Sequence, residues 1–369
     1  MEFKLVEDDV AKVEIEEEES SIGSSEFFRS EEEVEFSTSE EDEKWEDSEE
    51  EEVKVDWTVP KRETVRQVKK THYISGGALK YELKTNIFTT EARICKLARE
   101  NNALIILDRT GSLYIIEDGR THRIEVGIER NLQFTFEDFA VQGNLAVCVG
   151  RNRKSVIAVN IEEKTIREIR NHNQRNIQSF RKARFLSKDT YAVAGDAFVL
   201  IYSAKSHLLL STIETAEQVL DIHPDQDNSD ILYILTCDRL ITYSKTLQAQ
   251  TSHTEAIVLP ECISVAGDKI LVGSSGSLSI RNKYTLGLEK EYSNLEKVTD
   301  ISHSPEFSIS IFSNSEQENG VRIIDMQTQK IVKNFPNKKI FTKVTSTCPS
   351  KEGFYIAAGR QVHHLEIKK

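Results

Sequence analysis

Residues 145–159 read LAVCVGRNRKSVIAV: an apolar run that ends in Gly150, a polar turn, and a second apolar run. Six more copies of this phrase occur along the chain, at residues 103–116, 191–202, 232–243, 270–280, 308–324 and 355–365. Successive copies lie about 40 residues apart, which is the period of a β-propeller with several short strands in each blade. Seven blades that close into a ring expose only short strand edges. The repeat therefore predicts a seven-bladed β-propeller.

The segments just upstream of the copies indicate the kind of propeller. Innermost strands are predicted at residues 180–185, 216–222 and 297–301. The turns at 223–225 and 304–306 lie where a WD-repeat blade turns between its first and second strands. No Gly-His pair opens a blade and no Trp-Asp pair closes one, residues 324–326 being the nearest equivalent. We predict an all-β, WD40-like propeller that closes by apolar packing, without a stapling side-chain network. Residues 91–100, which also fit an amphipathic helix, are assigned as strand.

An acidic arm precedes this body. Residues 1–57 contain 25 Asp and Glu against 5 Lys and Arg, a formal charge of about −20, whereas the rest of the chain sums to about +7. Such dense charge with few apolar residues predicts disorder. The expected layout is an acidic disordered arm at 1–60, a basic linker at 61–85 and the propeller at 86–369. The arm is either a solubilising tail or a docking arm; its candidate docking residues are Leu5, Val6, Asp8, Trp45 and Trp57.

Motifs of catalysis are missing from the sequence. It contains no Gly-rich phosphate loop, no Gly-x-Ser-x-Gly, no His-Glu-x-x-His and no Cys-x-x-Cys. We therefore expect no enzyme activity, no cofactor and no metal. The five scattered cysteines fit buried free thiols in a reducing compartment. His363 and His364 are adjacent in a strand, so we expect one in the core and one in solvent. The sequence has no apolar run of about 20 residues, which predicts no membrane contact.

A basic cluster lies near the junction of the second and third blades. Its members, opposed only by Glu168, are Arg167, Arg170, Arg175, Arg181, Lys182 and Arg184. Much of this stretch is a long connection between blades, so we expect it to be exposed. It is a candidate for contact with RNA phosphates. Docking of acidic proteins and association with the acidic arm remain alternatives.

The block Asn319–Pro336, NGVRIIDMQTQKIVKNFP, resembles the penultimate blade of a nucleolar WD-repeat family, the U-three small nucleolar RNA-associated protein number eighteen. In that family the blade carries Val-Arg-Leu-Val-His-Leu-Pro and then a phrase that ends in Asn-Phe-Pro or Asn-Trp-Pro. Residues 356–359 resemble the strand of the family's last blade. Residues 44–47, which are followed by acidic residues and then by Val55-Asp56, resemble the family's acidic Trp-x-Asp stretch. Residues 5–8 resemble the family's early Leu-Val-Phe-Gly-Asp motif.

The resemblance implies a non-catalytic scaffold of the small-subunit processome, located in the nucleus and nucleolus. Its implied partners are other WD-repeat processome subunits and the pre-rRNA or small nucleolar RNA particle. The family also recruits an exosome-associated RNA helicase through a Leu-Phe-x-aliphatic-Asp motif of the arm. The helicase is thus an implied partner, although this chain has no clean copy of that motif. The competing hypothesis is a generic WD40 adaptor, histone-chaperone-like or for a ubiquitin ligase, whose acidic arm binds basic proteins.

Overall fold

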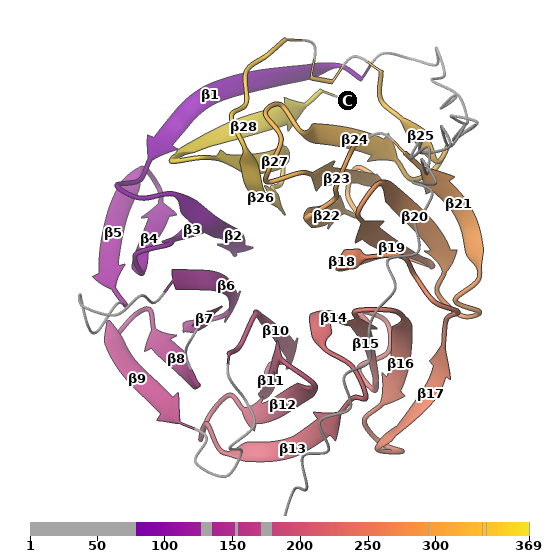
Figure 1. The fold of residues 1–369 in the computed structure, drawn as a ribbon. Coiled ribbons are helices and arrows are strands. Elements are labelled where there is room, and N and C mark those ends of the chain that lie inside the picture. Colours follow the sequence, from indigo (N-terminus) through magenta and orange to yellow (C-terminus); the bar gives the residue numbers. More distant parts are fainter. Residues whose placement is uncertain are drawn as a thin grey trace, which may run out of the picture. The chain divides into compact units, whose positions relative to one another are not determined.

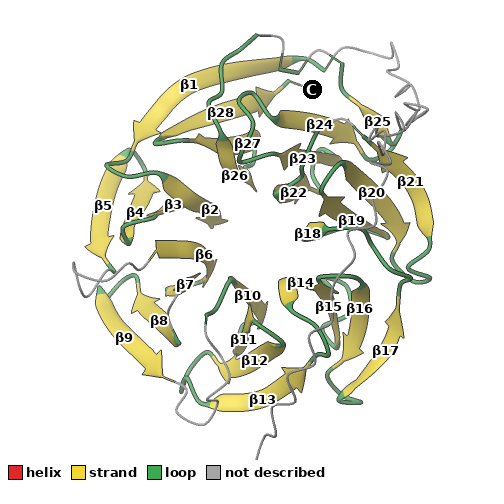
Figure 2. Ribbon diagram, viewed as in Figure 1, coloured by secondary structure: helices red, strands yellow, loops and turns green. Residues whose placement is uncertain are grey.

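Seven four-stranded antiparallel sheets surround a common axis in the computed structural model (Figure 1). The structure describes residues 79–126, 135–151, 154–170, 179–293, 295–333, 335–336 and 338–368. Within these ranges every regular element is a strand (Figure 2), and none is a helix long and apolar enough to cross a membrane. The prediction of an all-β, seven-bladed propeller is confirmed. The predicted arm, its five candidate docking residues and Arg175 lie outside the described residues.

The seven sheets are the blades, and in the first six the chain runs outward from the axis. Blade one contains β2 (Ile94–Glu100), β3 (Ala103–Asp108), β4 (Ser112–Glu117) and β5 (Arg120–Glu125); blade two contains β6 (Thr135–Gln142), β7 (Leu145–Arg151), β8 (Ser155–Asn160) and β9 (Thr165–Arg170). Blade three contains β10 (Lys182–Ser187), β11 (Thr190–Gly195), β12 (Phe198–Ser203) and β13 (Leu209–Glu214); blade four contains β14 (Val219–Pro224), β15 (Ile231–Thr236), β16 (Leu240–Ser244) and β17 (Ala249–His253). Blade five contains β18 (Pro260–Ala266), β19 (Lys269–Ser274), β20 (Ser277–Asn282) and β21 (Leu288–Tyr292); blade six contains β22 (Asp300–Ser304), β23 (Ile309–Ser313), β24 (Val321–Asp325) and β25 (Lys330–Ile331). Blade seven contains β26 (Val344–Pro349), β27 (Gly353–Ala358), β28 (Gln361–Ile367) and β1 (Tyr81–Thr89).

The repeated apolar phrase forms the two middle strands of each blade. In β7, Ala146 and Cys148 pack in the core between blades one and two, whereas Val147 and Val149 pack between blades two and three. Both faces of the strand are therefore buried, which explains why its apolar residues run on without a polar alternation. Full burial of such a side chain contributes about 1.5–3 kcal/mol. Residues 91–100, predicted as strand, contain β2 as expected.

The ring is closed by a strand from the N-terminal side of the propeller. β1 pairs with β28, so that Tyr81 lies opposite Ile367 and Phe88 opposite Val362. The expected start of the propeller at residue 86 is therefore too late, and residues 81–85 belong to blade seven rather than to a linker. This pairing joins the two ends of the propeller directly. It could not be inferred locally, because the partners lie far apart in the sequence.

The expectation for His363 and His364 is wrong, because both imidazoles are buried. Blade seven lies between blades six and one, so each face of β28 is covered by a neighbour. His363 Nδ1 accepts a hydrogen bond from the Asn86 backbone N–H at 3.2 Å, and His364 stacks on Tyr355. The cysteine expectation needs a smaller correction, since Cys237 is exposed and Cys95 is half-buried.

Acid is expected to destabilise the propeller well above the pH at which carboxylates titrate. Burial is the first cause that lowers the pKa of His207, His223, His303, His363 and His364, and it lowers that of His223 to about 4. An unfolded histidine titrates near pH 6.5. Between about pH 6.5 and the lowered values the unfolded chain binds more protons, so stability falls as the pH falls. Melting temperatures measured at about pH 7 and about pH 5 test this, and equal values would contradict it.

Candidate functional site

The innermost strands of all seven blades face the common axis (Figure 1). Near the starts of these strands lies a pocket of about 330 Å³, here called the channel mouth. All seven blades contribute side chains to its wall, and charged residues predominate. Its cations are Lys96, Arg109, Arg151, Arg181, Lys182 and Lys297, and its anions are Glu137, Asp138, Glu261, Asp300 and Glu316.

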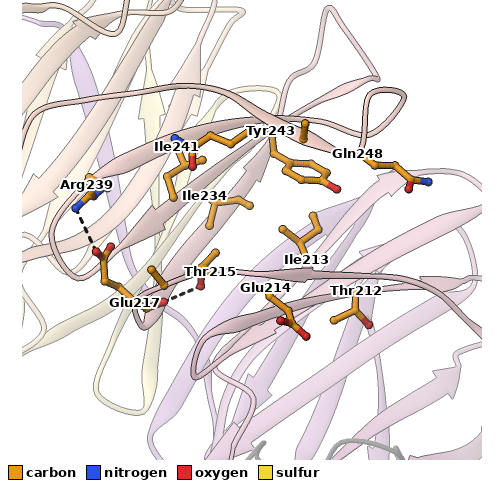
Figure 3. Close-up of a pocket in the computed structure, with 13 residues that line it drawn as sticks. Thr212, Ile213, Glu214, Thr215, Glu217, Ile234, Arg239, Ile241, Tyr243 and Gln248 are labelled. Carbon is orange, nitrogen blue, oxygen red and sulfur yellow. Dashed lines mark hydrogen bonds and ion pairs between the residues drawn. The ribbon is translucent and has the colours of Figure 1, made fainter.

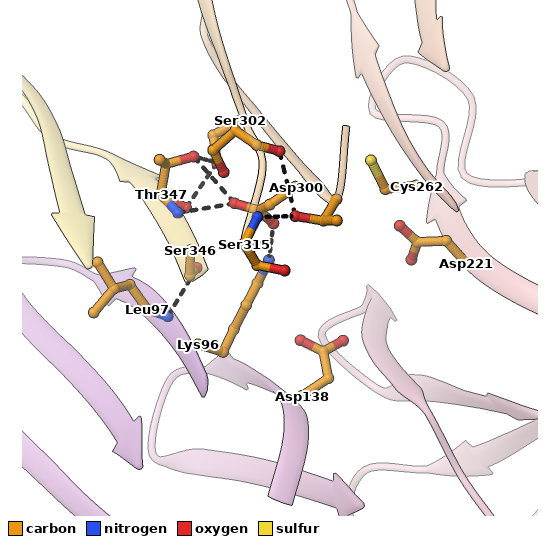
Figure 4. Close-up of polar contacts among 12 residues, drawn as sticks. Lys96, Leu97, Asp138, Asp221, Cys262, Asp300, Ser302, Ser315, Ser346 and Thr347 are labelled. Atoms are coloured by element: carbon orange, nitrogen blue, oxygen red, sulfur yellow. Dashed lines mark hydrogen bonds and ion pairs between the residues drawn. The ribbon is translucent and has the colours of Figure 1, made fainter. Parts of the chain in front are cut away.

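Three aspartates just inside the channel mouth tie neighbouring blades together. Asp138, Asp221 and Asp300 belong to the inner strands of blades two, four and six. Each Oδ2 accepts a hydrogen bond from a backbone N–H of the following blade. The donors are Ala183 at 3.2 Å, Ile263 at 3.2 Å and Thr347 at 2.8 Å, the last shown in Figure 4. Apolar packing is therefore not the only force that closes the ring, and the expectation of a missing side-chain network is wrong.

Two basic side chains compensate these buried carboxylates. Arg184 reaches both Asp138, with Nη1 2.5 Å from Oδ2, and Asp221, with Nη2 3.2 Å from Oδ1. Lys96 Nζ lies 2.6 Å from Asp300 Oδ1 (Figure 4). Burial alone would raise the pKa of Asp138, but the charges of Arg184, Lys182 and Lys96 outweigh it and hold that pKa below its usual value. The carboxylate is thus ionised at neutral pH.

Some cations of the channel mouth are already paired and others are not. Arg151 pairs with Glu137, and Lys297 pairs with Glu261 and Glu316. Among the described residues, Arg109, Arg181 and Lys182 have no ion-pair partner, and the Nε of Arg181 is buried without a hydrogen bond. Unpaired cations around a concave opening attract anions, because the low-dielectric walls focus their field. The channel mouth can therefore receive carboxylates or phosphates.

The predicted basic cluster does not form one patch. Arg181 and Lys182 line the channel mouth, whereas Arg184 is held between Asp138 and Asp221 and is not available to a partner. Arg167 and Arg170 lie on β9, the outermost strand of blade two, where Arg170 pairs with Glu168 at 2.7 Å. The cluster is split because β9 is the outermost strand of blade two, whereas β10, the next strand along the chain, is the innermost strand of blade three.

The sequence prediction missed Arg109 and the three aspartates. Arg109 comes directly after β3, in a turn that the linear pattern assigned to no site. The aspartates leave a readable signal: Phe136-Glu137-Asp138-Phe139, Val219-Leu220-Asp221-Ile222 and Val298-Thr299-Asp300-Ile301 share an apolar-x-Asp-apolar pattern. These copies are about two blade periods apart, so a search in alternate blades would have found them.

A second concavity opens between blades three and four and has a volume of about 410 Å³ (Figure 3). Its wall includes the buried side chains of Ile213, Ile234 and Ile241. The guanidinium of Arg239 at its edge pairs with Glu217 at 3.2 Å. Because its lining offers no unpaired cation, this groove is a weaker candidate than the channel mouth for binding an anion.

The described part of the chain contains one cluster of possible metal ligands and several free thiols. In the described part of the chain, the ligand atoms of Glu352, His364 and Glu366 lie within 4.8 Å of one another. His364 Nε2 is hydrogen-bonded to Ser350, however, and Glu366 pairs with Lys84, so these groups already have protein partners. Burial raises the pKa of the thiols of Cys95, Cys148, Cys262 and Cys348, the last to about 12, which keeps them protonated and unreactive.

Comparison with known proteins supports the fold and no narrower family. No protein-family model matches the sequence, and no curated protein matches it. Among solved structures, the WD40 β-propeller domain of Doa1 is similar, with a TM-score of 0.63 and 10% sequence identity. The alignment covers 79% of this chain and 98% of that domain. The comparison therefore shows that this chain has the β-propeller fold.

Proposed function

We propose that this protein is a non-catalytic scaffold subunit of the small-subunit processome that supports pre-rRNA processing in the nucleolus. The observation that carries the proposal is the sequence resemblance of Asn319–Pro336 to the penultimate blade of the processome family. The strands within that block, β24 and β25, lie in blade six of seven, which is the position that the resemblance requires. The other WD-repeat subunits are the proposed protein partners.

The channel mouth supplies a physical basis for work among polyanions. Arg109, Arg181 and Lys182 are close to the axis and form no direct ion pair in the described part of the chain. Such groups can bind RNA phosphates, with an affinity that falls as salt rises because the release of counterions into a more concentrated salt solution is less favourable. They can equally bind the acidic segments of other subunits. Both contacts suit a scaffold, and neither requires catalysis.

A generic adaptor is the second candidate function. It is favoured by residues 1–57, whose formal charge of about −20 suits a basic protein partner such as a histone. That candidate does not depend on RNA. It predicts complexes of modest size that survive treatment with ribonuclease.

Sedimentation of the tagged full-length protein separates the two functions. The scaffold proposal predicts that the protein migrates with very large pre-ribosomal particles, and that ribonuclease moves it to lighter fractions. Light complexes that ribonuclease does not change would support the adaptor and contradict the scaffold. The Arg120→Ala variant is the control and should sediment like the wild type, because Arg120 is exposed on the rim of blade one, away from the channel mouth.

A further inference from the structure

The outermost strand of blade three differs from its counterparts. Leu208, Leu209 and Leu210 are consecutive, and 66%, 39% and 57% of their respective surfaces are exposed. The corresponding strands of blades one, two and four, which read RTHRIE, TIREIR and AQTSH, carry charged or polar residues at most exposed positions, and that of blade five, LEKEY, has a single exposed leucine, Leu288. β13 is also the last strand of its sheet, so one side of its backbone has no neighbouring strand among the described elements. An apolar edge strand of this kind is a ready template for pairing with another chain.

One of these leucines, Leu209, lies on the side of the sheet where a groove opens between blades two and three. In the sheet register Leu209 lies opposite Tyr202, whose ring belongs to the core between these two blades. Directly paired residues share a face of the sheet, so Leu209 lies on the face toward blade two. A groove of about 480 Å³ opens there, with Leu145 and Phe185 among the apolar residues that line it.

Positive charge surrounds this groove. Arg167 on β9, Lys188 and Lys205 line it, and all three side chains are exposed. None of them has an ion-pair partner in the described part of the chain, and Asp189 is the one carboxylate in the lining. Burial, together with the charge of Arg167, lowers the pKa of the adjacent His207, so that imidazole is neutral at pH 7. The groove therefore combines three free cations with an apolar edge.

We propose that the groove between blades two and three, together with Leu208–Leu210, binds an extended, acidic segment of a partner protein. The segment would lie along β13, because an exposed edge accepts an added strand through main-chain hydrogen bonds. Since successive side chains of a strand point to opposite faces, alternate apolar residues would meet the leucines. Its carboxylates would pair with Arg167, Lys188 and Lys205. The proposal is independent of the processome assignment, because it uses neither the channel mouth nor the Asn319–Pro336 block.

The three leucines favour a protein segment over RNA. Single-stranded nucleic acid is usually held by aromatic side chains on which bases stack, beside a basic groove. The exposed residues next to these cations are aliphatic instead. Aliphatic side chains gain most from contact with the apolar side chains of another protein.

The test uses the full-length protein and short fluorescein-labelled peptides, with binding followed by fluorescence anisotropy. The probe alternates Glu and Leu, and a control peptide alternates Lys and Leu. One variant combines R167E, K188E and K205E, and a second carries L209D, because Leu209 is the leucine on the face toward the groove. Matched controls are R120E, on the outermost strand of blade one, and L247D, whose leucine is 69% exposed beside the corresponding strand of blade four.

We expect the Glu-Leu peptide to bind the wild type and both controls, and to bind each test variant at least about tenfold more weakly, equivalent to ~1.4 kcal/mol. Added salt should weaken binding, because exposed charges are screened. Equal binding by wild type and test variants, no binding of the acidic peptide, or equal binding of the Lys-Leu peptide would overturn the proposal. Displacement of the peptide by single-stranded oligouridylate would identify a phosphate site and would also overturn it. Unchanged melting temperatures show that the variants are folded.

Discussion

Replacement of Arg184 by alanine is expected to destabilise the propeller by about 3–5 kcal/mol, because it leaves buried carboxylates without their counter-charge. Arg184 bridges Asp138 and Asp221, which are 1% and 3% exposed in their side chains. The carboxylate of Asp138 also accepts the N–H of Ala183, so the loss should loosen the junction of blades two and three. Urea denaturation measures the effect through the midpoint and the slope of the unfolding transition.

Two controls make the Arg184 result specific. Arg167→Ala removes an exposed arginine from the outermost strand of blade two and should change stability by no more than about 0.5 kcal/mol. Asp138→Asn added to Arg184→Ala should restore part of the loss, because one uncompensated charge is gone. If the Arg184→Ala variant were as stable as the Arg167→Ala variant, the ion pairs of Arg184 with Asp138 and Asp221 would have no part in holding the blades together.

Gly195→Val is the second substitution with a large expected effect. A Cβ at Gly195 would lie 2.0 Å from the backbone oxygen of Ser179 and 2.9 Å from the Cα of Phe180, at the start of blade three. Backbone atoms cannot move aside as a flexible side chain can. We therefore expect a cost of about 1–3 kcal/mol from overpacking, or more if the strand shifts. The melting temperature of the variant is the measurement.

A substitution at a different glycine, Gly143, serves as a control that distinguishes the steric clash at Gly195 from backbone strain. Gly143 has a φ of +57°, but a Cβ there would meet no atom within 4 Å. Gly143→Ala should therefore cost only the conformational penalty of a left-handed residue, about 1–2 kcal/mol. Gly195→Val must be the more damaging change if close packing of blade three is the cause. Equal melting temperatures would contradict that explanation.

The strands that could be predicted from the sequence are those buried on both faces. β7 and β8 leave a continuous apolar run, and the same holds for β11 and β12, so the number of blades follows from counting. The rim strands leave a weaker signal because they are half-exposed and polar, and β25 is only two residues long. β1 reads YELKTNIFT, alternates poorly and pairs with a strand at the other end of the chain.

The candidate site was less predictable, for a physical reason. A basic cluster in sequence, such as residues 167–184, does not reveal which members reach the rim, the channel or a buried carboxylate. That depends on the radial position of each strand, which is set by pairing across the sheet. The loss of Arg184 as a partner contact and the addition of Arg109 both follow from this geometry.

The RNA in the fast-sedimenting fractions bears most directly on the proposed scaffold role. The tagged protein would be purified from those fractions, and uncleaved small-subunit rRNA precursor would be quantified against mature rRNA. The scaffold proposal predicts strong enrichment of the precursor, and a smaller enrichment for a variant in which Arg109, Arg181 and Lys182 are all replaced by alanine. Purified protein that carries no more precursor than an untagged control would contradict a role in the small-subunit processome.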